Sequence, residues 1–341
     1  MSRGALDFLV LTGFLGSGKT TLLRGFLTLP EAADTAVIVN EVGEIGLDGV
    51  VLREGGDVPM ATLSNGCVCC QIGSDLAFTI DRLIMAPRDE GAAPLRRIIL
   101  ETSGLSMPGP VLRTLATLAE HRMRVAVVGT FDLVRGTDVA TFEEAVAQWA
   151  AAHRIAATKA DLIAADDLAA ARSTIEAINP VAEVIAGADR GSVVQAAFAP
   201  LAVAPPLREI PADLASAHPR IALCLARPTD EVAYADLAAW LDNLAGALGE
   251  RLLRIKGLVR VAEARQPLLI ESVGTMFSPP RQLRTEEGAP ASFLVVIARD
   301  VDEAALESVA PIGLFRLSSW KKPDDPLARD GRRTMKAEWV V

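Results

Sequence analysis

The sequence predicts an α/β fold in which a doubly wound, mainly parallel sheet is followed by a smaller α+β domain. Two observations lead to this prediction. Between residues 8 and 185, short apolar runs alternate with helical patterns, as they do in successive β/α units. From about residue 218 the pattern changes to strand-like runs at residues 221–225, 252–261, 268–273 and 293–298, with helical patterns at 234–244 and 302–309.

The elements of the first domain follow from the same patterns. Strands are expected at residues 8–11, 36–39, 98–100, 125–128, 154–157 and 181–185. Helices are expected after residue 20 and at about residues 73–85, 142–149 and 166–178.

The chain divides into three predicted parts. Residues 1–200 form the first domain, residues 201–217 a proline-rich linker, and residues 218–341 the second domain with a loose polar tail. The charge-free stretch 191–207 is long enough to raise the question of a membrane span, but Pro200, Pro205 and Pro206 interrupt it. We therefore interpret this stretch as a linker.

Residues 13–20 read G-F-L-G-S-G-K-T, a glycine-rich motif that joins a strand to a helix and wraps phosphate groups. Lys19 is expected to meet the β- and γ-phosphates, and Thr20 to place its hydroxyl on a Mg²⁺ ion. The candidate nucleotide ligands share this loop and the start of its helix: Gly13, Gly16, Ser17, Gly18, Lys19, Thr20 and Thr21. The alternative is a glycine-rich turn that binds nothing.

An acidic loop follows the second predicted strand. Residues 40–49 combine glycines with carboxylates, which is typical of a switch segment that closes over Mg²⁺ and the γ-phosphate, although an ordinary solvated turn has the same composition. Glu44 and Asp48 are the two candidates for orienting the attacking water, and the sequence does not choose between them.

Two further strand ends carry candidate residues. Glu101 and Gly104 follow the strand at 98–100. An enzyme with a P-loop places the acid of its second nucleotide motif, and a glycine that senses the γ-phosphate, after such a strand. A surface turn is the alternative. Thr158, Lys159 and Asp161 follow the strand at 154–157. The Asp161 carboxylate could accept two hydrogen bonds from guanine, while the stem of Lys159 covers the base.

Three cysteines within four residues form a candidate metal site. Cys67, Cys69 and Cys70 cannot all point into a core, but they can converge on one ion if Gly66 lets the loop curl. Thiolates suit Zn²⁺, and Glu41 is the candidate fourth ligand, with water as the alternative. A reduced packing cluster or a redox pair is the competing interpretation. Cys224 lies alone in an apolar run and is expected in the core.

Composition excludes several classes of partner. The formal net charge of −9 and the absence of a basic stripe argue against nucleic acid and against an anionic membrane surface. Asp7 and the phosphate loop rule against reading the N-terminus as a signal peptide, and the clustered cysteines do not resemble a disulfide framework. These features predict a cytoplasmic protein. A homodimer remains open.

In order and spacing, G-F-L-G-S-G-K-T, N-E-V-G-E-I-G-L-D, N-G-C-V-C-C, E-T-S-G and T-K-A-D resemble the CobW-type GTPases, a family of P-loop metallochaperones. The second domain resembles theirs at R-I-K-G, residues 254–257. The resemblance implies GTP hydrolysis with phosphates held by residues 16–20, guanine selection by Lys159 and Asp161, and metal binding by the three clustered cysteines. It also implies delivery of zinc or cobalt to a recipient metalloenzyme.

Three features depart from that family. Thr158 stands where many GTPases have asparagine, no histidine-rich stretch is present, and His153 stands where relatives often have aspartate. His121, His153 and His218 are each isolated, which favours structural or surface roles over metal binding. Two alternative functions remain: a P-loop small-molecule kinase or ATPase with a structural zinc knuckle, and a metal-binding adaptor that does not hydrolyse its nucleotide.

Overall fold

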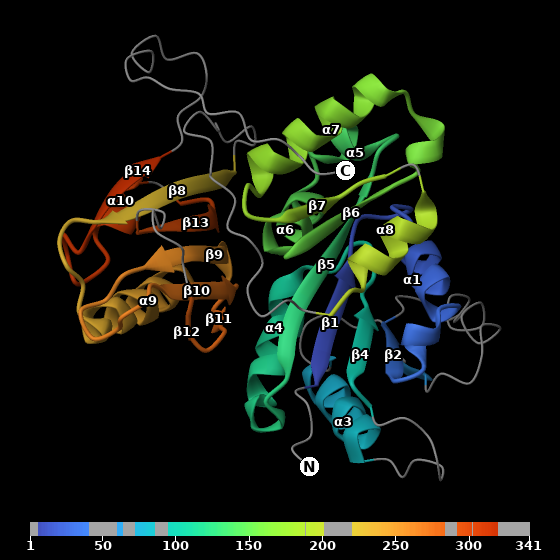
Figure 1. Cartoon of the computed structure of the whole chain (residues 1–341), viewed down its shortest axis with the longest axis horizontal. Coiled ribbons are helices and arrows are strands. Elements are labelled where there is room, and N and C mark those ends of the chain that lie inside the picture. Colours follow the sequence, from blue (N-terminus) through green and yellow to red (C-terminus); the bar gives the residue numbers. More distant parts are fainter. Residues whose placement is uncertain are drawn as a thin grey trace.

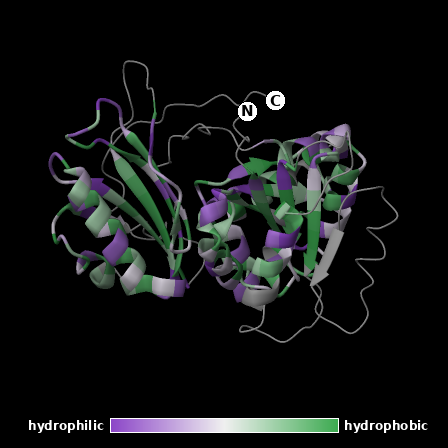
Figure 2. Ribbon diagram, turned by 90° about the horizontal axis from the view of Figure 1, so that it is seen from below, coloured by the Kyte–Doolittle hydropathy of each residue, from purple (hydrophilic) through white to green (hydrophobic). Residues whose placement is uncertain are grey.

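The computed structural model describes residues 6–40, 60–63, 72–85, 95–187, 189–200, 220–283, 292–301 and 303–319. Two sheets dominate these residues, one in each predicted domain (Figure 1). Figure 2 shows that the strands of both sheets are mostly hydrophobic, whereas the surrounding helices alternate hydrophilic and hydrophobic residues. The fold class predicted from the sequence is confirmed.

The described part of the first domain contains a sheet of seven strands in the order β3-β2-β4-β1-β5-β6-β7, all paired in parallel. The strands are β1 (Asp7–Thr12), β2 (Thr35–Asn40), β3 (Met60–Leu63), β4 (Arg97–Glu101), β5 (Arg124–Asp132), β6 (Arg154–Thr158) and β7 (Glu183–Ile185). Because β1 lies between β4 and β5, the chain leaves β1 toward one edge of the sheet and later returns to the other. A nucleotide binds at this switch point, beyond the carboxyl ends of the strands.

Helices cover both faces of this sheet, because its central strands are apolar on both sides. Phe8 and Val10 face a core shared with α3 (Ile72–Met85), α4 (Pro108–Thr117), α6 (Glu143–Ala151) and α7 (Ala165–Ile178). Leu9 and Leu11 face the opposite core, which α1 (Lys19–Leu27) and α8 (Arg190–Ala197) cover. The short helix α5 (Gly136–Val139) follows β5.

The second domain contains an antiparallel sheet in the order β11-β10-β9-β13-β8-β14, with β12 paired to β10. Its strands are β8 (Ile221–Pro228), β9 (Leu252–Val259), β10 (Leu268–Val273), β11 (Met276–Phe277), β12 (Arg281–Gln282), β13 (Phe293–Arg299) and β14 (Phe315–Ser319). Helix α9 (Tyr234–Leu248) covers one face, and α10 (Glu303–Glu307) precedes β14.

The other face of this second sheet packs against the first domain. Along β8, Leu223 and Leu225 join the core that contains α6, whereas Cys224 joins the core beneath α9 and is 2% exposed. The prediction that Cys224 is a core residue is therefore confirmed. Because one apolar core runs through both domains, the two sheets are held together by packing as well as by polar contacts.

The R-I-K-G segment of β9 is held by tight packing within the second sheet and by burial of its two cations. Opposite β13, the register shifts so that Leu253 is an extra residue, after which Arg254 pairs with Ile297 and Lys256 with Val295. A side chain at Gly257 would lie 2.1 Å from the carbonyl oxygen of Phe293, so only glycine allows this approach of the two strands. Arg254 and Lys256 are buried, at 0% and 5% exposed.

Several segments differ from the sequence-based expectation. Residues 191–197 of the stretch interpreted as a linker lie in helix α8 (Arg190–Ala197), whose first turn is capped by the Asp189 carboxylate accepting from the N–H groups of Gly191 and Ser192. The linker prediction is therefore wrong for these residues, and residues 201–217 lie outside the described residues. Helix α4 and strand β14 were not predicted. Within the described residues, no helix is long and apolar enough to cross a membrane.

The buried Lys256 makes stability depend on pH in a defined direction. Burial and the charge of Arg254 lower the pKa of Lys256 from 10.5 to about 8. The unfolded chain therefore binds a proton between pH 8 and pH 10.5 that the folded chain does not, and stability rises with pH across that window. We expect Lys256→Met to raise the free energy of unfolding at pH 7 by on the order of 2 kcal/mol.

The extra stability of Lys256→Met over wild type should shrink between pH 8 and pH 10.5. Across this range the unfolded wild-type chain also loses the proton on Lys256, so the folded chain no longer pays for keeping that lysine neutral. Urea unfolding of both proteins across this range measures the difference. A difference in unfolding free energy that stays constant with pH would show that folding does not lower the pKa of Lys256.

Candidate functional site: a phosphate loop at the carboxyl edge of the sheet

The predicted phosphate loop lies between β1 and α1, at the carboxyl edge of the parallel sheet. Gly13, Gly16 and Gly18 all have positive φ angles, of 148°, 70° and 88°. These conformations are open to glycine and strained for other residues, which explains the spacing of the motif. The Lys19 ammonium donates to the carbonyl oxygens of Gly13 (2.8 Å) and Phe14 (3.2 Å), so it lies over the concave side of the loop. Thr21 is exposed on the first turn of α1.

Hydroxyl groups from two other strands hold this loop from beneath. Ser17 and the buried Thr130 of β5 share a hydrogen bond of 2.6 Å between their hydroxyl oxygens. The Thr158 hydroxyl, at the end of β6, donates to the carbonyl oxygen of Ser17 at 2.8 Å. The loop is thereby fixed to β5, which lies beside β1, and to β6, which lies beside β5.

Glu101 and Thr20 meet as the sequence predicts. Glu101 ends β4, directly beside β1, and is 5% exposed. The Thr20 hydroxyl donates to Glu101 Oε1 at 2.6 Å. A hydroxyl and a carboxylate this close present the oxygen ligands that Mg²⁺ takes in P-loop sites, so these residues fit the ion.

Gly104 lies against the phosphate loop. A side chain at Gly104 would lie 2.7 Å from both the backbone nitrogen and the Cδ2 atom of Leu15. The fully buried Gln148 of α6 fixes this segment, because its amide nitrogen donates to the carbonyl oxygens of Gly104 and Ser106, each at 3.0 Å. Sequence reasoning missed Gln148, since an isolated glutamine in a helix carries no motif.

The residues predicted to contact the base lie just beyond β6. Lys159 has a positive φ of 62°, and its ammonium donates to Asp132 Oδ2 at 2.6 Å. Asp132 is 4% exposed and also accepts from the backbone N–H groups of Val134 and Arg135. Asp161 lies in a short helical turn (Ala160–Leu162) and is exposed to solvent, so its carboxylate is accessible. Asp132, which orients Lys159, was not among the predicted site residues.

The remaining predicted site residues lie outside the described residues. These are the switch acids and the metal ligands Glu41, Glu44, Asp48, Cys67, Cys69 and Cys70. Within the part of the chain that the structure describes, no three His, Cys, Asp or Glu side chains form a group that could hold a metal ion. The predicted cysteine site therefore stays a prediction.

Two of the three histidines have structural partners. His121 Nε2 lies 2.6 Å from the Asp81 carboxylate. His153 is half-buried and lines the interdomain space, and its Nδ1 accepts from the N–H of Val127 at 3.0 Å. Burial, together with the charges of Arg254, Lys256 and Arg154, lowers the pKa of His153 well below its usual value. His153 is thus a neutral acceptor at pH 7, and His218 lies outside the described residues.

A glycine loop joins the first strand to the first helix of a parallel sheet, its lysine lies over the loop, and its threonine lies beside an acid from the neighbouring strand. These features define a P-loop nucleotide-binding protein. Residues 7–186 match the CobW/HypB/UreG nucleotide-binding domain, and residues 221–309 match the C-terminal domain of the cobalamin synthesis protein CobW. The chain belongs to the CobW/HypB/UreG family.

Characterised relatives are similar to the chain over most of its length. The zinc chaperone CobW of Pseudomonas aeruginosa is 32% identical and covers 88% of this chain and 89% of its own length. The zinc chaperone YjiA of Escherichia coli is 28% identical, with 88% and 96% covered. The crystal structure of Zn(II)-bound YjiA GTPase from E. coli superposes with a TM-score of 0.61 at 23% identity, over 92% of this chain and 99% of that one, and so shows a shared fold.

Substitution of Gly104 tests whether this glycine must approach the phosphate loop. Gly104→Ala should push Leu15 outward and weaken nucleotide binding by about tenfold, since overpacking typically costs about 1–3 kcal/mol. In the control Gly109→Ala, the added methyl group meets only Arg113 Nη1 at 3.8 Å, and affinity should be unchanged. Titration of both variants with a fluorescent guanine nucleotide measures the effect. Equal affinities in the two variants would show that the contact does not shape the site.

Proposed function

We propose that this chain is a GTP-hydrolysing metallochaperone, which binds Zn²⁺ or Co²⁺ through its cysteine cluster and passes the ion to a recipient metalloprotein in the cytoplasm. The observation that carries the proposal is the meeting of the phosphate loop, Thr20 and Glu101 at the carboxyl edge of the sheet. Family membership and the names of its relatives as zinc chaperones support the choice of metal.

Hydrolysis would rest on charge stabilisation by the phosphate loop. In the proposed complex, the Lys19 ammonium leaves its loop carbonyls for the β- and γ-phosphate oxygens, where it offsets the charge that develops during transfer. Thr20 and Glu101 are the residues that would hold Mg²⁺, whose charge would add to that of Lys19 at the phosphate oxygens. The backbone N–H of Gly104 would contact the γ-phosphate, and Glu44 or Asp48 would orient the attacking water.

Selection of guanine would rest on Asp161 and Lys159. The exposed Asp161 carboxylate can accept from the two N–H donors on the Watson–Crick edge of guanine, a pair of donors that adenine lacks. The ion pair with Asp132 holds Lys159 beside this position, where its aliphatic stem can cover the base. Thr158 takes no part in base contacts in this scheme, because its hydroxyl already bonds the phosphate loop.

The metal would bind to thiolates of Cys67, Cys69 and Cys70, with Glu41 as fourth ligand. Because Glu41 belongs to the acidic loop that would close on the γ-phosphate, metal affinity and nucleotide state would be linked. Such linkage works in both directions: if GTP raises zinc affinity, zinc raises GTP affinity by the same factor. Hydrolysis would then release the ion to the recipient.

Zinc titration with bound GDP or a non-hydrolysable GTP analogue tests this function. We expect the two nucleotide states to differ in zinc affinity by at least about fivefold, which is the lower end of typical coupling between sites. Cys69→Ser should abolish tight binding in both states. The control Cys224→Ser changes a cysteine that is buried in the second domain, away from the phosphate loop, and should retain the coupling. Full zinc affinity in Cys69→Ser, or identical affinities in both states, would contradict the proposal.

A further inference from the structure

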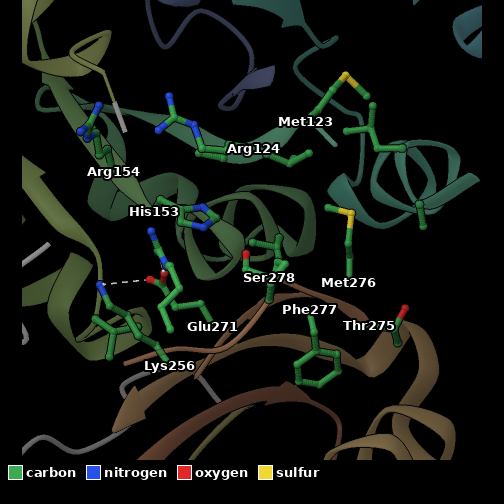
Figure 3. A pocket seen from close by; sticks show the side chains of 18 of the residues that line it. Met123, Arg124, His153, Arg154, Lys256, Glu271, Thr275, Met276, Phe277 and Ser278 are labelled. Atoms are coloured by element: carbon green, nitrogen blue, oxygen red, sulfur yellow. Dashed lines mark hydrogen bonds and ion pairs between the residues drawn. The ribbon is translucent and has the colours of Figure 1, made fainter. Parts of the chain in front are cut away.

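A cavity of about 850 Å³ lies between the two domains (Figure 3). Arg124, Arg154 and Glu183, the first residues of β5, β6 and β7, form one wall, and β10 to β12 of the second sheet form the other. The cavity is therefore at the amino edge of the parallel sheet, whereas the phosphate loop is at the carboxyl edge. Its volume is within the range of small-molecule pockets, and nothing in the proposed GTPase mechanism uses it.

One side of the cavity is rich in positive charge. Figure 3 shows Arg154, Lys256, His153 and Glu271 on this side. Among the described residues, five cationic side chains and two carboxylates line the whole cavity: Arg122, Arg124, Arg154, Lys256 and Arg281, with Glu183 and Glu271. This excess of cations stands out in a chain whose formal net charge is −9.

The two lining carboxylates do not balance these cations. Glu183 pairs with Arg154 at 3.0 Å, and Arg124 pairs with Asp7, which lies outside the cavity wall. Glu271 alone serves both Lys256, at 3.7 Å, and Arg281, at 3.2 Å. Lys256 and Glu271 are each below a tenth exposed, so solvent compensates this imbalance poorly.

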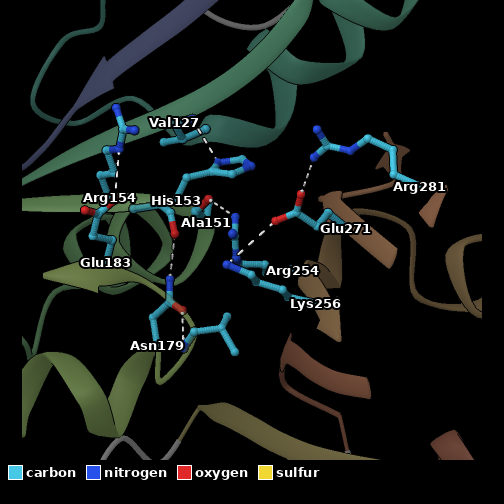
Figure 4. A network of polar contacts seen from close by, with 12 residues as sticks. Val127, Ala151, His153, Arg154, Asn179, Glu183, Arg254, Lys256, Glu271 and Arg281 are labelled. Carbon is cyan, nitrogen blue, oxygen red and sulfur yellow. Dashed lines mark hydrogen bonds and ion pairs between the residues drawn. The ribbon is translucent and has the colours of Figure 1, made fainter. Parts of the chain in front are cut away.

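Arg254 adds a third cation around Glu271 (Figure 4). This guanidinium is fully buried, and its Nη1 donates a long hydrogen bond of 3.4 Å to the carbonyl oxygen of Ala151. Its Nε and Nη2 atoms have no hydrogen-bond partner among the described residues. Buried donors without partners are rare in proteins and point to a missing acceptor.

The opposite side of the cavity is apolar. Figure 3 shows Met123 and Met276 facing each other across this end. Leu115 and Leu118, from α4 and the residue after it, and Phe277 of β11 line the same cavity. Thioether side chains adapt to the shape of different apolar groups, so this end suits a flexible hydrocarbon.

We propose that this cavity binds a small amphipathic organic anion, with its acidic head beside Lys256 and Arg281 and its apolar body between Met123 and Met276. Lys256 and Arg281 share the single carboxylate of Glu271, and the acidic head would give them a second negative charge. The apolar body would bury surface that the two domains leave uncovered. The site is separate from the nucleotide and metal sites, so it stands independently of the proposed function.

Binding should also depend on pH through Lys256. The groups around this lysine are Arg254 on its own strand, Glu271 on the adjacent β10, and Glu183 and His153 of the first domain; Arg281 of β12 pairs with Glu271. Of these, Lys256 is the one whose pKa is lowered to about 8, while the His153 pKa lies far lower and that of Arg254 at about 10. Anion affinity should therefore fall as the pH rises through 8.

Isothermal titration of the full chain with octyl phosphate tests the proposal, with octanoate as a second acidic head and octanol as the neutral control. We expect both anions to bind at one site and octanol to bind at least about tenfold more weakly, since its neutral hydroxyl cannot form a charge-assisted hydrogen bond with two ionised partners. Saturating GDP should not displace octyl phosphate, because the phosphate loop lies at the other edge of the sheet.

Two variants with the same loss of charge locate the site. Lys256→Met should weaken octyl phosphate binding by about tenfold or more and remove the pH dependence near 8. Arg260→Met removes an exposed cation just beyond β9, outside the cavity, and should change affinity less than about twofold. Met276→Glu, at the apolar end, should weaken binding without touching the cationic end.

No binding of either anion up to about 1 mM, or equal affinity for octanol, would overturn the proposal. Equal affinities in Lys256→Met, Arg260→Met and wild type would overturn it as well. Circular dichroism and thermal unfolding of each variant confirm that the protein titrated is folded.

Discussion

The hydrogen bonds between the phosphate loop and the strands beneath it are the constraint on which the rest of the site depends. Ser17 is held by the Thr130 and Thr158 hydroxyls, and Thr20 by Glu101, so β4, β5 and β6 each fix one part of the loop. Parallel pairing brings the carboxyl ends of these strands together at one edge. Residues more than a hundred positions apart thereby meet around one phosphate cradle.

Helix α6 connects this cradle to the second domain. Toward the nucleotide site, Gln148 binds the Gly104 segment, Trp149 donates to the carbonyl oxygen of Thr130, and Phe142, just before the helix, packs on Phe14 of the loop. Toward the second domain, Glu143 pairs with Arg220 and Arg299, and Ala151 accepts from Arg254. Helix α6 thus contacts the phosphate site on one side and Arg220, Arg254 and Arg299 of the second domain on the other. These contacts fix the position of the second sheet relative to the first.

Most of the fold was predictable because its signals are local. Buried parallel strands are short apolar runs, and the glycine motif requires its own strand and helix. Helix α8 was missed because a charge-free run ending in prolines resembles a linker, although Asp189 is an N-cap signal. Thr130, Asp132 and Gln148 act through partners distant in sequence, and the interdomain cavity takes its charges from both domains. No pattern along the chain could reveal such contacts, since they exist only after the domains pack.

Steady-state GTP hydrolysis tests the central claim most directly, that the described loop is the phosphate site of a guanine-specific enzyme. The account predicts hydrolysis of GTP in preference to ATP, and a loss of about a hundredfold or more in Lys19→Ala, the size expected when a preorganised charge is removed from the reacting phosphate. The control Arg24→Ala, which changes an exposed cation at the end of the same helix, should retain the rate. Equal rates in wild type and Lys19→Ala would contradict the account.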